Sequence, residues 1–78
     1  MDKAFVLINA EMGVESEMLK AVMEIPEVKE AHMVYGVYDI IVMVEAPSMQ
    51  ELKNVISFKI RRLDKVRSTI TMIVIEGE

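Results

Sequence analysis

The strand-like segments of this chain of 78 residues are apolar on both faces, which limits the folds it can adopt. A strand with one face in water alternates apolar and polar residues. Here the alternation divides an unbroken aliphatic run into Ile40, Val42 and Val44 on one side and Ile41 and Met43 on the other. The C-terminal run divides in the same way into Ile70, Met72 and Val74 against Ile73 and Ile75. Both faces of the sheet therefore need an apolar cover.

The N-terminal part of the chain changes from a strand pattern to a helix pattern. Residues 4–10 are a short apolar run rich in β-branched side chains, and Gly13 follows as a breaker, which predicts a first strand. Over residues 14–25 the apolar positions recur at intervals of about four, which predicts a helix that Pro26 ends. The apolar stripe of this helix comprises Val14, Met18, Ala21, Val22 and Ile25.

The rest of the chain predicts a hairpin, a second helix and a last strand. Residues 28–35 and 39–45 are typical of strands, joined by the connection Gly36-Val37-Tyr38. Ser48 can cap the second helix while Glu51 reaches back to it, as in a capping box. The stripe of this helix comprises Met49, Leu52, Val55, Ile56, Ile60 and Leu63. Residues 66–76, rich in Val, Ile and Thr, predict the last strand.

The order β-α-β-β-α-β indicates an α+β fold of one domain over residues 1–78. The economical arrangement is a ferredoxin-like sandwich, a four-stranded antiparallel sheet with both helices on one face. Burying an aliphatic side chain fully contributes roughly 1.5–3 kcal/mol of stability. If about four or five of them stay exposed on the other face, ~6–15 kcal/mol of stabilisation is lost. Because that amount rivals the stability of a whole domain, we predict a homodimer that pairs the two sheets, as in dimeric αβ-barrel proteins.

Phe58 lies off the apolar stripe of the second helix. A single exposed aromatic is common on protein surfaces and needs no partner. The alternative is a second interface, which would allow assembly beyond a dimer.

The charge balance argues against several classes of function. The chain has 13 Asp and Glu against 9 Lys and Arg, so we expect no direct DNA binding based on phosphate contacts. The local basic segment complements the end of a helix: Lys59, Arg61, Arg62, Lys65 and Arg67. The longest stretch without charge, residues 68–75, is too short to span a membrane, and we expect a cytoplasmic protein without membrane contact.

The sequence lacks the residue combinations typical of catalytic and metal-binding sites. His32 is the only histidine and there is no cysteine, so no ligand set for a metal ion is evident. The sequence also has no glycine-rich phosphate loop and no activated nucleophile. We therefore expect no catalytic residues, no metal and no cofactor.

The turn between the middle strands is the most informative segment. Gly36 at a hairpin tip allows a positive φ and leaves backbone N–H groups open to a carboxylate. Asp39, at the start of the next strand, can accept an ammonium group. Together they suit a zwitterion, although glycine and aspartate are also ordinary turn residues.

Three segments resemble the effector-binding domain of the leucine-responsive and asparagine regulators, the feast/famine family, whose regulatory module is called the RAM domain. They are residues 32–42 with the Gly-x-Tyr-Asp element, the helix entry Ala46-Pro47-Ser48-Met49, and residues 66–74 with Thr-x-Thr. The resemblance covers nearly the whole chain. It implies a ferredoxin-like sandwich that dimerises sheet to sheet, with dimers assembling into rings of eight or ten subunits.

The resemblance also implies a site for a free amino acid between dimers. The loop that holds the effector matches Gly36, Val37, Tyr38 and Asp39, and positions matching His32, Val34, Tyr35, Thr69 and Thr71 line it. Many members place Asp where Val37 stands, so the kind of amino acid stays open. Full-length members also carry a helix-turn-helix domain, which we do not expect here because the first strand begins at about residue 4.

These observations favour an oligomeric regulatory module over an enzyme. Amino-acid binding would change its assembly, and its targets would be full-length regulators of the same family or a metabolic enzyme. One rival is a small dimeric αβ-barrel monooxygenase or isomerase that recruits His32, Tyr35, Tyr38 and Asp39. A cavity between sheet and helices would favour that enzyme, and a cleft between dimers would favour the regulator. The other rival is a structural oligomer without a ligand.

Overall fold

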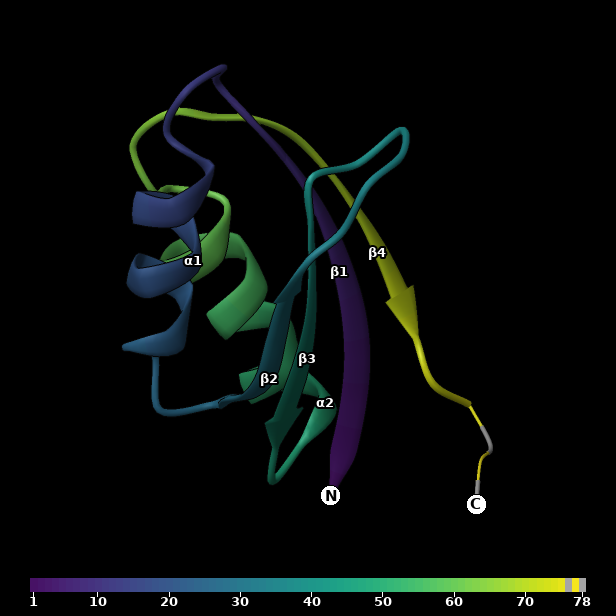
Figure 1. Cartoon of the computed structure of the whole chain (residues 1–78). Helices are drawn as coiled ribbons and strands as arrows, with labels where there is room; N and C mark the ends of the chain where they lie inside the picture. Colours follow the sequence, from purple (N-terminus) through teal and green to yellow (C-terminus); the bar gives the residue numbers. More distant parts are fainter. Residues whose placement is uncertain (76, 78) are drawn as a thin grey trace.

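The computed structural model describes residues 1–75 and 77, and it has one sheet with both helices on the same side (Figure 1). The elements are β1 (Asp2–Ala10), α1 (Glu15–Met23), β2 (Val28–Met33), β3 (Ile40–Ala46), α2 (Met49–Val55), the π-helix η1 (Ile56–Ile60) and β4 (Val66–Ile73). All neighbouring strands are antiparallel, and their order is β2-β3-β1-β4. The predicted ferredoxin-like fold is confirmed. No helix among the described residues is long and apolar enough to cross a membrane.

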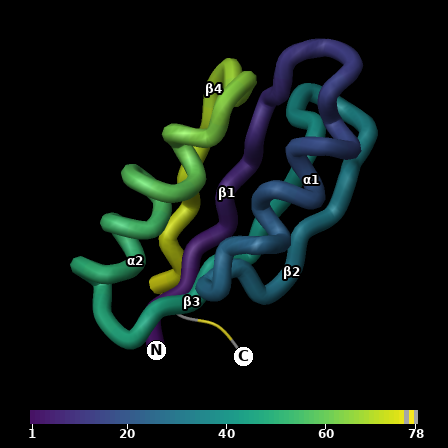
Figure 2. Tube along the Cα trace, turned by 90° about the vertical axis from the view of Figure 1, so that its left-hand side faces the viewer, coloured from purple at the N-terminus to yellow at the C-terminus, as the bar shows by residue number. Residues whose placement is uncertain are grey.

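The core lies between the sheet and the two helices, which run side by side over one face (Figure 2). Every second residue of the central strands is buried there: Ala4, Val6, Ile8 and Ala10 in β1, and Ile40, Val42, Val44 and Ala46 in β3. The predicted helix stripes supply the other side, with Met18, Val22, Leu52, Val55, Ile56 and Ile60 buried. The alternation predicted for the middle strands is therefore confirmed.

The opposite face of the sheet is bare in this structure. The strand register brings together six apolar side chains, here called the open face: Phe5, Leu7, Ile41, Met43, Ile70 and Met72. Phe5, Ile70 and Met72 are 39%, 45% and 47% exposed, so no described element covers them. The predicted second apolar face exists, and one copy of the chain leaves it in contact with water.

Polar pairs border the open face at both ends. Lys3 Nζ lies 3.7 Å from a carboxylate oxygen of Glu45 at one end. On the edge strand β2, His32 Nε2 lies 3.3 Å from Glu30 Oε1. At the other end Asn9 pairs with Ser68 in the ladder between β1 and β4. An apolar centre with a polar rim is typical of a protein interface.

Several element boundaries differ from those predicted. β2 ends at Met33, and Val34 N–H donates to Asp39 O (2.8 Å), so the hairpin connection is longer than the predicted three residues. β4 ends at Ile73, so the predicted strand is too long at Val74 and Ile75, and Glu76 lies outside the described residues. The paired register ends at Met33 and at Ile73, and beyond each of these residues a single backbone hydrogen bond continues the ladder: Val34 N–H to Asp39 O and Val74 N–H to Lys3 O (3.0 Å).

The second helix begins as predicted and then changes its winding. Ser48 Oγ accepts a hydrogen bond from Glu51 N–H (3.2 Å), which confirms the cap. Arg61 N–H donates to Ile56 O (2.9 Å), five residues back, as in a π-helix. Phe58 within η1 is 56% exposed, as its place off the stripe predicted, and the Arg62 guanidinium lies 4.9 Å from its ring centre.

Candidate functional site

The connection between β2 and β3 projects from the sheet on the side away from the helices (Figure 1). At its tip Tyr35 is fully exposed and Val37 is 84% exposed. The φ of Gly36 lies outside the positive region, so the connection does not use the conformational freedom that a glycine allows. A Cβ at Gly36 would meet no other atom within 4 Å. No residue that the structure describes therefore covers the tip, and the backbone does not require a glycine there.

Asp39 anchors the base of this connection. Its backbone N–H donates to Ile8 O (3.0 Å), and its Oδ2 accepts from Ala10 N–H (2.9 Å). Asn9 adds a second contact when its carboxamide is oriented to satisfy both of its polar atoms: Nδ2 then donates to Val37 O (3.0 Å) and Asp39 Oδ2 (3.3 Å). One carboxylate oxygen of Asp39, which the sequence assigned to a ligand, is thus already bonded to the fold.

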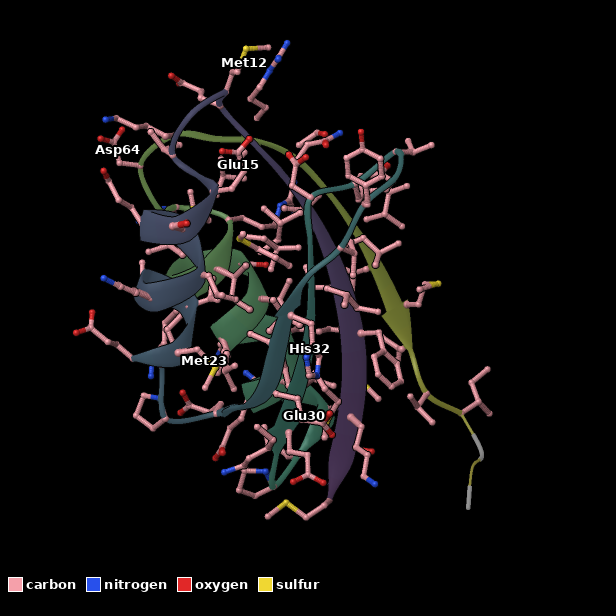
Figure 3. The ribbon with its side chains drawn as sticks, in the orientation of Figure 1. Met12, Glu15, Met23, Glu30, His32 and Asp64 are labelled. Atoms are coloured by element: carbon pink, nitrogen blue, oxygen red, sulfur yellow. The ribbon has the colours of Figure 1, made fainter. Side chains whose placement is uncertain are left out.

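The remaining predicted site residues lie in other places. His32 lies in the ladder of β2 opposite Ile41, on the open-face side, and Figure 3 shows it beside Glu30. Thr69 and Thr71 lie on β4 opposite Ile8 and Val6, which places them on the helix side of the sheet. Since β2 and β4 are the two edge strands, one copy of the chain does not bring the nine predicted residues together.

Two pockets lie near the end of the sheet where β1 ends and β4 begins. The first, here called the Arg67 pocket, has a volume of about 420 Å³ and is lined by Asn9, Ala10, Met12, Glu15, Asp39, Arg67 and Ser68. The second has about 290 Å³ and is lined by Arg61, Val66, Arg67, Ser68 and Thr69. Each contains one predicted site residue, Asp39 in the first and Thr69 in the second.

A third pocket, of about 240 Å³, lies on the helix side. It is lined by Val14, Glu17, Met18, Ala21, Leu63, Asp64 and Lys65. It includes none of the four residues that the enzyme hypothesis recruits, His32, Tyr35, Tyr38 and Asp39. Its residues therefore provide no support for that hypothesis.

Comparison with known proteins gives the family. The family model described as Lrp/AsnC ligand binding domain matches residues 3–77. This chain is an Lrp/AsnC ligand-binding domain. An uncharacterized HTH-type transcriptional regulator of Pyrococcus abyssi is 34% identical over 70 residues, which cover 90% of this chain and 44% of that protein. The resemblance that the sequence indicated is confirmed, and this domain spans about half the length of such curated relatives.

Solved structures agree with this assignment. The crystal structure of FFRP-DM1 is 43% identical and has a TM-score of 0.92, covering 96% of this domain and 100% of that chain. A transcriptional regulator of Neisseria meningitidis, solved as a complex with L-Met, has a TM-score of 0.83 over 97% of this domain and 51% of that chain. At 15% identity the latter likeness shows the fold alone.

Sequence reasoning missed Asn9 and Arg67 as candidates. In the sequence, Asn9 stands within an apolar strand segment and Arg67 within a solvated basic segment, so neither pattern indicates a binding role. The available signal was topological: in the order β-α-β-β-α-β, the end of the first strand, the hairpin turn and the start of the last strand meet at one end of the sheet. Polar residues at these three points lie close together in the Lrp/AsnC domain.

One ion pair shifts the pKa of a carboxyl group, and it lies away from the predicted site. Lys59 Nζ donates to Glu27 Oε1 (3.0 Å), joining η1 to the start of β2. This hydrogen bond lowers the pKa of Glu27 below its ordinary value, against a smaller opposing effect of burial. A lowered pKa in the folded state means that the pair stabilises the fold above the unfolded pKa, and that this stability disappears as the pH falls through the folded pKa.

We expect Glu27→Gln to lower the free energy of unfolding at pH 7 by about 0.2–1 kcal/mol, the range for an exposed pair. Near pH 3, below the unfolded pKa of about 4.3, the difference from the unchanged protein should shrink. Urea denaturation at both pH values, at one protein concentration, measures it. Glu24→Gln, an exposed glutamate without a recorded ion pair, is the control. An equal difference at both pH values would contradict the assignment.

Proposed function

We propose that residues 1–78 form an oligomeric regulatory module that binds a free amino acid at the junction between copies. The observation that carries the proposal is that one chain supplies an anchored but uncovered loop: Asp39 holds its base, while Tyr35 and Val37 at its tip are exposed to water. The open space over Gly36 leaves room for a ligand or a second chain. The site is therefore incomplete in one copy.

The proposed junction begins with a homodimer through the open face. Six apolar side chains form the middle of that face, three of them exposed and three partly exposed, and the pairs Lys3–Glu45 and Glu30–His32 border them. Burying them against a second sheet stabilises the pair at roughly 25 cal/mol per Å² of apolar surface. The projecting loop lies on the same side, so dimerisation brings it close to a second chain.

The proposed effector-binding residues are Gly36, Val37, Tyr38, Asp39, His32, Val34, Tyr35, Thr69 and Thr71. The loop and the two threonines lie at different places in one chain, so a single site that uses both needs parts of two copies. Rings of eight or ten subunits would provide such junctions. The exposed Phe58 of η1 is the proposed place for contacts beyond the dimer.

The relatives support a regulatory role over an enzymatic one, because they are named transcriptional regulators. The excess of acidic over basic residues does not favour phosphate contacts by this domain, so the proposal assigns DNA contact to full-length regulators that accept this module. The L-Met complex of a protein with this fold supports an amino acid as ligand. We also propose a cytoplasmic location, because the relatives are named transcriptional regulators.

A thermal-shift screen of the twenty amino acids tests the proposal. A ligand that binds only the folded assembly at a concentration about 100-fold above its Kd stabilises it by about 2.7 kcal/mol, which raises the melting temperature. Native mass spectrometry with and without the same amino acid should show a change in subunit number. A flat screen together with an unchanged assembly would leave the structural oligomer as the better hypothesis.

A further inference from the structure

The Arg67 pocket holds charges of both signs that the fold does not pair. Three elements contribute them: Arg67 at the start of β4, Asp39 at the start of β3 and Glu15 at the start of α1. Among the described residues, the ion pairs within 4.0 Å are Lys3–Glu45, His32–Glu30 and Lys59–Glu27. A guanidinium and two carboxylates therefore line one pocket, and no ion pair within 4.0 Å joins them among the described residues.

The hydrogen bonds in this pocket leave specific atoms free for a ligand. Glu15 Oε1 accepts from Gly13 N–H (3.1 Å) and Asp39 Oδ2 accepts from Ala10 N–H (2.9 Å), so each carboxylate has one oxygen engaged. A carboxylate has about four acceptor positions, and a guanidinium has five donors. The Arg67 fork and the second oxygen of Glu15 have no recorded protein partner among the described residues.

We propose that this pocket binds the charged end of the amino-acid effector. Arg67 donates to the α-carboxylate, for which its planar fork is suited, and the Ser68 hydroxyl adds a further donor. Glu15 accepts from the α-ammonium group, while Asp39 fixes the wall between the pocket and the β2–β3 loop. This inference rests on the proposed function, since it specifies which atoms of the amino acid this chain recognises.

The geometry of the pocket agrees with that assignment. Its volume of about 420 Å³ lies within the roughly 300–1,000 Å³ of small-molecule sites. It adjoins the base of the loop, because Asp39 belongs to both and Asn9 contacts Val37 O. A ligand held by its charged end at Arg67 therefore directs its side chain toward the loop and toward the second chain of the proposed junction. Residues of a single copy then bind the charged end.

Isothermal calorimetry with ligand analogues tests the proposal. The probes are the twenty L-amino acids and, for each one that binds, its α-amide, which lacks the carboxylate, and its N-acetyl derivative, which lacks the ammonium. Arg67→Gln should weaken binding of the amino acid by about tenfold or more, the effect of losing a hydrogen bond to a charged group. Binding of the α-amide should be weak in the unchanged protein and insensitive to this substitution.

Further variants separate recognition from a structural effect. Glu15→Gln should weaken binding of the amino acid but leave binding of its N-acetyl derivative unchanged. Arg67→Lys should restore part of the affinity, because it keeps the positive charge. Arg62→Gln is the matched control, since Arg62 lies over Phe58 and does not line the pocket. Subunit number is measured for each variant.

The outcomes distinguish the two proposals. If an amino acid binds the unchanged protein and Arg67→Gln binds it equally well, the pocket assignment is overturned while the proposed function stands. Equal losses for the acid and its amide would also overturn the assignment, because the carboxylate would not be the group recognised. If no amino acid binds the unchanged protein, both proposals are overturned.

Discussion

Met72→Glu is expected to convert the assembled protein into monomers at micromolar concentration. Met72 lies on the open face opposite Phe5 and is 47% exposed in one copy. Because Met72 is about half exposed in one copy, we take half of the roughly 1.5–3 kcal/mol that full burial of such a side chain contributes. A symmetric dimer contains two copies of Met72, so the substitution removes about 1.5–3 kcal/mol of apolar burial in total. Desolvating a carboxylate in the interface adds several kcal/mol. We therefore expect the dissociation constant of the dimer to rise by at least about 100-fold.

Light scattering coupled to size-exclusion chromatography measures this change. Met33→Glu is a matched control: Met33 is also an exposed methionine, at 49%, but it pairs with Ile40 and so lies on the helix side of the sheet. It should leave the dimer intact. A dimer that withstands Met72→Glu, or an unchanged protein that is already a monomer, would show that the open face is not the interface.

Asp39→Ala is expected to abolish amino-acid binding while leaving the dimer intact. Asp39 Oδ2 accepts from Ala10 N–H, and the same carboxylate is within reach of Asn9, so its removal frees the base of the loop. Leaving a partly buried donor unsatisfied costs about 1–3 kcal/mol of stability. The dimer should persist because Asp39 is not among the open-face residues. Calorimetry and light scattering on the same sample measure the two effects.

Asp39→Asn separates anchoring from a charge effect. Asparagine retains an acceptor oxygen for Ala10 N–H, so we expect the stability and most of the affinity to return if Asp39 acts as an anchor. If Asp39→Asn binds as poorly as Asp39→Ala, the negative charge itself contacts the ligand. Undiminished affinity in Asp39→Ala would reject the site assignment.

The predictable part of the fold was local. The spacing of Met18 and Val22 predicted a helix face, and the alternation of Ile40, Val42 and Val44 predicted a buried strand face, because side-chain direction follows directly from helix and strand periods. Ser48 capped its helix as expected, since a cap needs only neighbouring residues. The β-α-β-β-α-β order then left few ways to close a sheet, and the ferredoxin-like arrangement is the observed one.

The candidate site was less predictable, because it depends on which backbone groups remain unpaired. No local pattern indicates that Ala10 N–H needs the Asp39 carboxylate, or that Gly36 avoids a positive φ. The first follows from the β1–β3 ladder, which ends at Ile8 and Ile40 and so leaves Ala10 without a partner in β3. The second belongs to the connection that starts where β2 and β3 stop pairing, at Met33 and Ile40. The same holds for η1, where the change to π-winding moves the residues after Ile56 out of the register of an ideal helix.

The sequence by itself determined that this protein has more apolar strand surface than two helices can cover, since each strand residue points to one face or the other. It also determined the family through the hairpin and the last strand. Only the tertiary structure decided how the polar residues group: Arg67, Asp39 and Glu15 line one pocket, whereas Thr69 and Thr71 lie on the helix side of the sheet. The physical reason is that antiparallel pairing brings residues far apart in the sequence to the same end of the sheet. Which strands pair is decided only when the whole sheet forms.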